Sequence, residues 1–196
     1  IRPPEWGQAS REALYFNEAV CHIVLPDFDA DRPQQLDLAL VIATTGSMGD
    51  ELEYLKTEID DIVSRLRETF PNVDPRFALI VYRDHGDQYV SRTFDFTRSL
   101  DDLRGELSRQ HASGGGDNPE AVHIALDQAA GLSWRRGNVA RVAFLVGDAP
   151  PHDSDMFAAF EATNQLRAGG VRLYPVASSG VDVKAEFMMR SAAFLT

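Results

Sequence analysis

The stretch from Leu36 to Leu66 places the tightest constraint on how this chain can fold. Its apolar run from Leu38 to Ile42 predicts a strand buried on both faces, which is typical of parallel sheets. A polar turn follows at residues 44–47, and the spacing of apolar residues then changes from two to about 3.6. The predicted helix has an apolar stripe made of Leu52, Leu55, Ile59, Ile62, Val63 and Leu66. The turn therefore lies at the carboxyl end of a central strand, where open α/β sheets bind their ligands.

Alternating strands and helices continue along the rest of the chain. Further apolar segments predict strands at residues 77–82, 88–96, 140–146 and 171–177. Apolar residues at helical spacing predict helices at residues 49–69, 99–110, 119–129, 153–168 and 185–195. The third of these helices is expected to start at Pro119, with Asp117 or Asn118 as its cap. The alternation predicts an open, mostly parallel, Rossmann-like α/β sheet with helices on both faces and the 88–96 strand at an edge.

The first 35 residues differ in character from the rest. They contain one short apolar segment, residues 19–25, and an acidic, proline-bounded stretch at residues 26–33. We therefore predict an N-terminal extension or linker at residues 1–35 and a single domain at residues 36–196. Because the chain opens at Ile1 and not at methionine, we expect it to be a fragment or a processed product.

The charge balance narrows the classes of partner. The formal net charge is −11, which argues against nucleic acid or an anionic membrane surface as the main partner. There is no run of 18 apolar residues, so no membrane segment is predicted in this chain. Cys21 is the single cysteine and excludes an intrachain disulfide. An acidic protein of this kind is compatible with cation binding.

The segment that follows the first predicted strand resembles the first motif of the von Willebrand factor A (VWA) domain. That motif, the start of the metal-ion-dependent adhesion site (MIDAS), has the pattern Asp-x-Ser/Thr-x-Ser. Here Thr45 and Ser47 match the two hydroxyl positions, whereas Ala43 stands where the family has its aspartate. The glycine-rich segment Gly-Gly-Gly-Asp-Asn-Pro-Glu at residues 114–120 resembles a subgroup of the family with Gly-Gly-Gly-Asp-x-Pro-Glu. The resemblance implies the VWA fold, with one further strand beyond the last helix that this sequence does not reach.

The resemblance also implies a site for Mg²⁺ or Mn²⁺ built from three loops. Its ligands would be Thr45 and Ser47 from the first loop, Asp117 from the second and Asp148 from the third. Asn118 is an alternative to Asp117 in the second loop. Asp50 and Glu51 correspond to an acidic pair that holds an adjacent ion in some integrin subunits. Independently of the family, Mg²⁺ prefers six oxygen ligands at about 2.0–2.1 Å, which hydroxyls, carboxylates and water supply.

Ala43 is expected to weaken this site. Loss of a carboxylate near a metal ion typically costs about 10 to 100-fold in affinity. A deliberate substitution and natural degeneration of the motif both account for the alanine, and both predict weak or absent metal in this form. Simpler roles also fit the other residues, because Thr45 and Ser47 can cap a helix and Asp148 can form a turn.

The leading hypothesis is a non-enzymatic interaction module that recognises an acidic side chain of a partner protein through the cation. A structural VWA domain with an unused site inside a larger assembly is the alternative. A hydrolase with Ser47 as nucleophile would need glycine at position 45 for the Gly-x-Ser-x-Gly pattern, and the chain has threonine there. Residues 45–49 lack the lysine of a nucleotide-binding P-loop, so the sequence does not favour nucleotide binding there. The histidines show no zinc-binding spacing, and His152 is expected at the rim of the site.

Overall fold

The computed structural model describes residues 11–16, 19–24, 33–116 and 118–196. The chain divides into two compact units, at residues 1–32 and 33–196. In the first unit, β1 (Arg11–Phe16) pairs with β2 (Ala19–Val24) in an antiparallel hairpin. The second unit contains all of the remaining helices and strands among the described residues.

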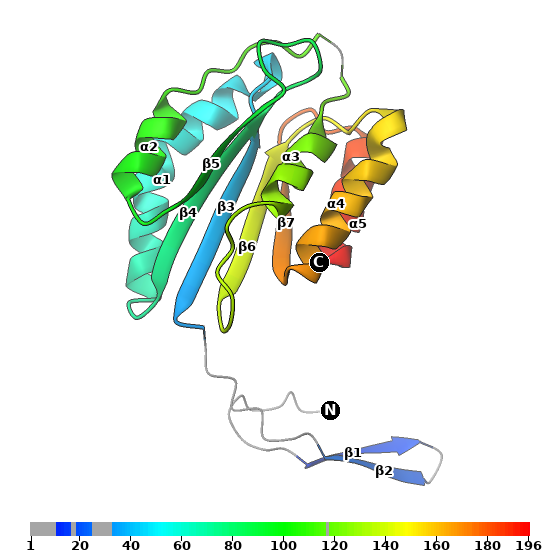
Figure 1. Ribbon diagram of the computed structural model, residues 1–196. Coiled ribbons are helices and arrows are strands. Elements are labelled where there is room, and N and C mark those ends of the chain that lie inside the picture. Colours follow the sequence, from blue (N-terminus) through cyan, green and yellow to red (C-terminus); the bar gives the residue numbers. More distant parts are fainter. Residues whose placement is uncertain (1–10, 17–18, 25–32, 117) are drawn as a thin grey trace. The chain divides into compact units, whose positions relative to one another are not determined.

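A five-stranded sheet forms the centre of the second unit (Figure 1). Its strands are β3 (Gln35–Ala43), β4 (Asp74–Tyr82), β5 (Ser91–Thr97), β6 (Ala140–Gly147) and β7 (Val171–Ala177). They lie in the order β5-β4-β3-β6-β7, and every neighbouring pair is parallel except β4 and β5. This arrangement confirms the predicted α/β class, including the edge position of the strand predicted at residues 88–96. Residues 39–43 of β3 are buried, as expected for a central strand.

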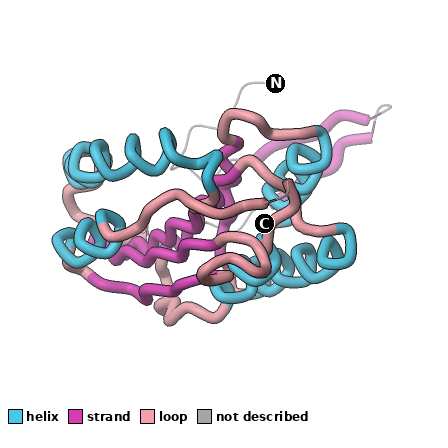
Figure 2. The backbone as a smooth tube through the Cα atoms, turned by 90° about the horizontal axis from the view of Figure 1, so that it is seen from above, coloured by secondary structure: helices cyan, strands magenta, loops and turns pink. Residues whose placement is uncertain are grey.

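Helices cover both faces of the sheet (Figure 2). On one face, α1 (Gly49–Thr69) lies beside α2 (Leu100–Ser108), which packs on β4 and β5. On the other face, α3 (Val122–Ala130) packs on β3 and β4 and against α4 (Met156–Ala168), while α5 (Val183–Leu195) contacts α4 and β7. Short 3₁₀ turns at Gly46–Met48 and Asp153–Asp155 precede α1 and α4. None of the helices in the described part of the chain has the length and apolar character needed to cross a bilayer.

The start of α3 differs from the sequence prediction. The helix begins at Val122, three residues after the predicted start at Pro119. The intervening backbone donors are used elsewhere: the N–H of Glu120 donates to the carbonyl of Pro150 at 2.9 Å, and that of Ala121 donates to Arg83 at 3.2 Å. Glu120 also forms an isolated parallel β-bridge with Pro151. These long-range bonds satisfy the backbone donors outside a helix, so the local helix signal of proline does not decide the structure.

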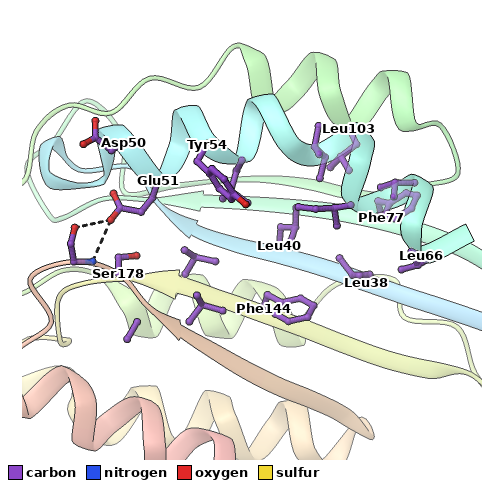
Figure 3. Close-up of a pocket in the computed structure, with 18 residues that line it drawn as sticks. Leu38, Leu40, Asp50, Glu51, Tyr54, Leu66, Phe77, Leu103, Phe144 and Ser178 are labelled. Atoms are coloured by element: carbon purple, nitrogen blue, oxygen red, sulfur yellow. Dashed lines mark hydrogen bonds between the residues drawn. The ribbon is translucent and has the colours of Figure 1, made fainter. Parts of the chain in front are cut away.

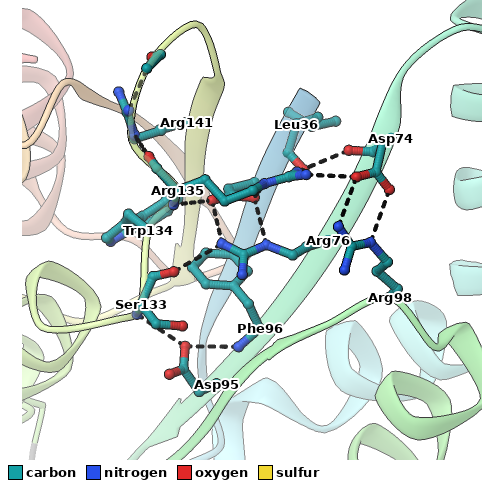
Figure 4. A network of polar contacts seen from close by, with 12 residues as sticks. Leu36, Asp74, Arg76, Asp95, Phe96, Arg98, Ser133, Trp134, Arg135 and Arg141 are labelled. Carbon is teal, nitrogen blue, oxygen red and sulfur yellow. Dashed lines mark hydrogen bonds and ion pairs between the residues drawn. The ribbon is translucent and has the colours of Figure 1, made fainter. Parts of the chain in front are cut away.

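A polar network closes the end of the sheet where β3 and β4 begin (Figure 4). Asp37 is fully buried and accepts hydrogen bonds from Arg76 at 2.7 and 3.0 Å. Arg135 donates to the same carboxylate from its Nε and its backbone N–H, both at 2.7 Å, and its Nη1 reaches Asp74. Arg98 donates to Asp74 at 3.1 and 3.2 Å. The network ties the loop before β6 to the two central strands.

This network predicts that stability falls in acid. Burial by itself would raise the pKa of Asp37, but hydrogen bonds from Arg76 and Arg135 outweigh it and hold that pKa below its usual value of 3.8. The hydrogen bond from Arg98 likewise lowers the pKa of Asp74. A depressed folded-state pKa means that the stabilisation is complete above the unfolded-state pKa and is lost as the pH falls through the folded-state value. We expect the stabilisation by Asp37 and Asp74 to be complete above about pH 5, and the urea midpoint to drop below about pH 4 as this stabilisation is lost. A midpoint unchanged down to pH 3 would contradict this expectation.

An open apolar groove lies on the face of the sheet that carries α1 (Figure 3). Its volume is about 720 Å³, and it lies between the side of α1 and strands β3, β6 and β7. Leu38, Leu40 and Phe144 lie along the strands that line it, while Tyr54 approaches from the helix. The side chain of Tyr54 is 64% exposed. The helix α1 therefore covers only part of this face.

Candidate metal centre

Three loops meet at the end of the sheet where β3, β4 and β6 finish (Figure 1). The loop after β3 bonds to the glycine-rich loop: the N–H of Gly46 donates to Gly114, and that of Ser113 donates to Thr44, both at 3.1 Å. The segment that follows the glycine-rich loop bonds in turn to the loop after β6, through the Glu120–Pro150 hydrogen bond. The first, second and third loops of the predicted site are thus adjacent in space.

Glycine is required at position 115 for this approach. Gly115 has φ of 74°, a left-handed conformation that disfavours side chains. A Cβ atom placed there would lie only 2.8 Å from Cβ of Thr45. The N–H of Gly115 donates to the Asp87 carboxylate at 3.1 Å, and this hydrogen bond holds the glycine-rich loop against the turn after β4. The glycine-rich loop can therefore lie directly against the hydroxyl-bearing turn.

The three loops enclose a polar cavity of about 310 Å³. Thr45 and Ser47 line it from the first loop, and Asp148 lines it from the third. The glycine-rich loop and its continuation contribute Asn118 and Glu120. No lysine, arginine or histidine is among the residues that line the cavity, all of which belong to the described part of the chain. The cavity is therefore an oxygen-rich, acidic site.

Glu120 lines the cavity, although the sequence analysis did not select it as a site residue. It is 2% exposed, and its Oε1 accepts a hydrogen bond of 2.6 Å from the hydroxyl of Thr45. The Thr45 hydroxyl also lies 3.4 Å from Oγ of Ser47. Glu120 belongs to the glycine-rich motif, but a helix starting at Pro119 would have made it an ordinary first-turn acid. The β-bridge to Pro151 turns this residue into a wall of the cavity instead.

Two carboxylate oxygens of the cavity are buried without a hydrogen-bond partner among the described residues: Oε2 of Glu120 and Oδ1 of Asp148. Burial raises the pKa of Glu120 to about 7; the hydrogen bond from Thr45 opposes this shift, whereas the charges of Asp148, Asp84 and Asp87 add to it. Burial and the charges of Glu120 and Asp148 also raise the pKa of Tyr82. The site thus concentrates negative charge in a buried position that lacks a balancing cation among its lining side chains.

The remaining predicted residues occupy different positions. Asp117 lies outside the described residues. Asn118 lines the cavity and donates a hydrogen bond to Asp182 at 2.9 Å. Asp50 and Glu51 do not line the cavity, and both border the apolar groove (Figure 3). Glu51 accepts a 2.8 Å hydrogen bond there from the hydroxyl of Ser179.

His152 lies near this site without lining the cavity. Its Nε2 is 2.7 Å from Oδ1 of Asp84. Asp84 is itself one of the acidic residues whose charge acts on Glu120. The histidine therefore belongs to the surroundings of the site and not to its wall.

Ala43 ends the central strand in a tightly packed row. It is fully buried, pairs with Tyr82 of β4, and adjoins Gly147 of β6. A Cβ atom at Gly147 would lie 2.6 Å from the Tyr82 hydroxyl and 3.5 Å from Cβ of Ala43. The tyrosine side chain therefore extends across the small residue at position 43 to reach the glycine.

Comparison with known proteins agrees with this architecture. Residues 37–179 match the sequence pattern of the von Willebrand factor A domain. The α-protein kinase vwkA of Dictyostelium discoideum is 30% identical over 149 residues, which are 74% of this chain and 24% of that protein. The human von Willebrand factor A domain-containing protein 7 is 31% identical over 130 residues, which are 66% of this chain and 14% of that protein. The chain therefore spans no more than about a quarter of the length of either relative.

A solved structure gives the same picture of the fold. The BatB protein of Bacteroides thetaiotaomicron superimposes with a TM-score of 0.60 at 16% identity, covering 81% of this chain and 85% of that one. At that identity the likeness concerns the fold alone. The sequence match covers most of the second unit, from the central strand to the loop after β7. The chain belongs to the von Willebrand factor A domain family.

Proposed function

We propose that the acidic cavity binds a divalent cation, Mg²⁺ or Mn²⁺, and through it an acidic side chain of a partner protein. VWA domains are generally non-enzymatic interaction modules, common in adhesion and in complex assembly. The observation that carries the proposal is a pair of buried oxygens, on Glu120 and Asp148, that have no hydrogen-bond partner among the described residues and lie beside the hydroxyls of Thr45 and Ser47. Buried carboxylates are costly unless they are paired or coordinate a metal.

The donor chemistry fits a hard cation. Hydroxyl and carboxylate oxygens are the ligands that Mg²⁺ and Mn²⁺ prefer, and water completes the shell. Thr45, Ser47, Glu120 and Asp148 would hold the ion, with Asp117 and Asn118 as further candidates from the glycine-rich loop. The bound ion would neutralise the excess negative charge and present a position that a carboxylate can occupy.

Ala43 sets the strength of this proposed site. The family's aspartate at that position is absent, whereas Glu120 supplies a carboxylate from the second loop. We therefore propose weak cation binding in this form. A structural domain whose site is unused would also have an alanine at position 43, but it would show no specific binding. A hydrolase based on Ser47 is disfavoured because no imidazole is among the described residues that line the cavity.

Isosteric removal of the Glu120 charge tests the ligand set. Glu120→Gln should weaken Mg²⁺ or Mn²⁺ binding at least about 10-fold, since loss even of an outer-shell partner costs about 10 to 100-fold. The variant should remain folded without metal, because it removes one like charge from the acidic cluster. Calorimetric titration and the metal-dependent rise in Tm are the measurements.

Glu161→Gln provides the matched control, because Glu161 is exposed on α4. It should bind the ion as the unmodified chain does. Equal metal affinities for the unmodified chain, Glu120→Gln and Glu161→Gln would show that Glu120 is not a ligand. Absence of any binding by the unmodified chain at millimolar metal would favour the structural alternative.

A further inference from the structure

A second group of metal-binding side chains lies outside the acidic cavity. His85 follows β4, His123 lies in the first turn of α3, and Asp155 ends the 3₁₀ turn before α4. One ligand atom from each residue lies within 4.8 Å of the other two. These residues are far apart in the sequence, which explains why spacing alone gave no zinc motif.

The distances between these atoms suit a shared ion better than a direct hydrogen bond. Nδ1 of His123 is 3.6 Å and Nε2 of His85 is 3.9 Å from the same oxygen, Oδ2 of Asp155. A hydrogen bond would bring such atoms to about 2.7–3.2 Å. Two ligands that are each about 2.0–2.1 Å from a tetrahedral zinc ion lie about 3.3 Å apart. A small contraction would therefore bring all three atoms to ligand distances.

His123 provides an independent indication of a missing partner. Its Nδ1 is buried and has no hydrogen-bond partner among the described residues. The unpartnered nitrogen lies on the side facing Asp155, where an ion would be held.

Neighbouring side chains complete the surroundings. The His152 ring is 5.9 Å from the His85 ring, and the Nε2 of His152 is engaged with Asp84. His152 is therefore a neighbour of the group and not one of its ligands. His85 is about half exposed, so the group opens to solvent on that side. A water molecule could therefore occupy the fourth coordination position of an ion held by these three residues.

We propose that His85, His123 and Asp155 bind a Zn²⁺-class transition-metal ion, with water as the fourth ligand. Imidazole nitrogens favour zinc and its neighbours, whereas the oxygen-lined cavity favours Mg²⁺ or Mn²⁺. The bound ion would join the turn after β4, the first turn of α3 and the start of α4. This site is separate from the proposed adhesion function and does not depend on it.

The test uses Zn²⁺ by calorimetry and Co²⁺ as a spectroscopic probe on the full chain. We expect a single Zn²⁺ site that raises Tm, and visible Co²⁺ absorption of a tetrahedral, nitrogen-containing site. His85→Ala should reduce Zn²⁺ affinity about 100-fold or more, because loss even of an outer-shell partner costs about 10 to 100-fold. This variant removes a half-exposed side chain and should fold normally. His111→Ala, at an exposed position outside the group, is the matched control and should bind as the unmodified chain does.

Asp148→Asn separates this site from the acidic cavity. It should leave Zn²⁺ binding and the Co²⁺ spectrum unchanged while it weakens Mg²⁺ binding. Loss of Zn²⁺ binding in Asp148→Asn but not in His85→Ala would assign the ion to the cavity and overturn the proposal. Equal Zn²⁺ affinity in His85→Ala and the unmodified chain, or no Zn²⁺ binding at all, would also overturn it.

Discussion

Replacing Asp37 with alanine is expected to lower the free energy of unfolding by about 3 to 5 kcal/mol, the range for breaking a buried ion pair. The side chain is fully buried and accepts hydrogen bonds from Arg76 and Arg135. Its removal leaves both guanidinium groups without their shared acceptor, and each is itself mostly buried. Urea unfolding followed by circular dichroism measures the change.

Asp61→Ala is the matched control for that substitution. Asp61 lies on the exposed side of α1, where it pairs with Arg65 at 4.0 Å, and such surface pairs contribute about 0–1 kcal/mol. Asp37→Asn should lie between the two, because it keeps the shape of the side chain and removes its charge. A loss below about 1 kcal/mol for Asp37→Ala would show that the arginines find other partners or water.

Replacing Ala43 with aspartate is expected to tighten Mg²⁺ or Mn²⁺ binding by about 10 to 100-fold. The same change should lower stability in EDTA, since it adds an acid at a fully buried position that pairs with Tyr82, a residue on which the charges of Glu120 and Asp148 already act. Metal affinity should rise and stability without metal should fall for the same reason, which is the negative charge added beside the site. Calorimetric titration gives the affinity, and Tm with and without metal gives the stability.

Ala43→Asn separates charge from volume in this experiment. Asparagine occupies nearly the same space between Tyr82 and Gly147, so steric strain in the packed row should be similar in both variants. The aspartate variant should gain clearly more stability than the asparagine variant when metal is added. Equal metal affinity in the two variants would count against a cation site beside position 43.

Local sequence signals predicted the regular elements well. The change in apolar spacing around residues 44–47 defines α1, and the structure places that helix at Gly49–Thr69 as predicted. The strand predicted at residues 171–177 has the same bounds as β7. Such elements follow from patterns within a few residues: continuous apolar runs for strands buried on both faces, a period of 3.6 for an amphipathic helix, and Gly169 at the helix end.

The start of α3 shows where local signals fail. Proline at position 119 is compatible with a first helical turn, but the N–H of Glu120 bonds to Pro150, thirty residues later in the chain. That bond depends on β6 and the loop after it being in place. The same misplacement hid the role of Glu120, because the extended backbone carries its side chain into the cavity. Asp117, the residue chosen from this loop, stays a prediction.

The sequence by itself determined the α/β class, the order of the strands and helices and the hydroxyl-bearing turn, because periodicity and turn chemistry are properties of neighbouring residues. Only the tertiary structure decided that Glu120 shares the cavity with Thr45, Ser47 and Asp148, and which imidazoles lie together beside Asp155. Those groupings join loops tens of residues apart. Their geometry depends on long-range backbone bonds and on the close approach of Gly115 to Thr45, which no local pattern encodes.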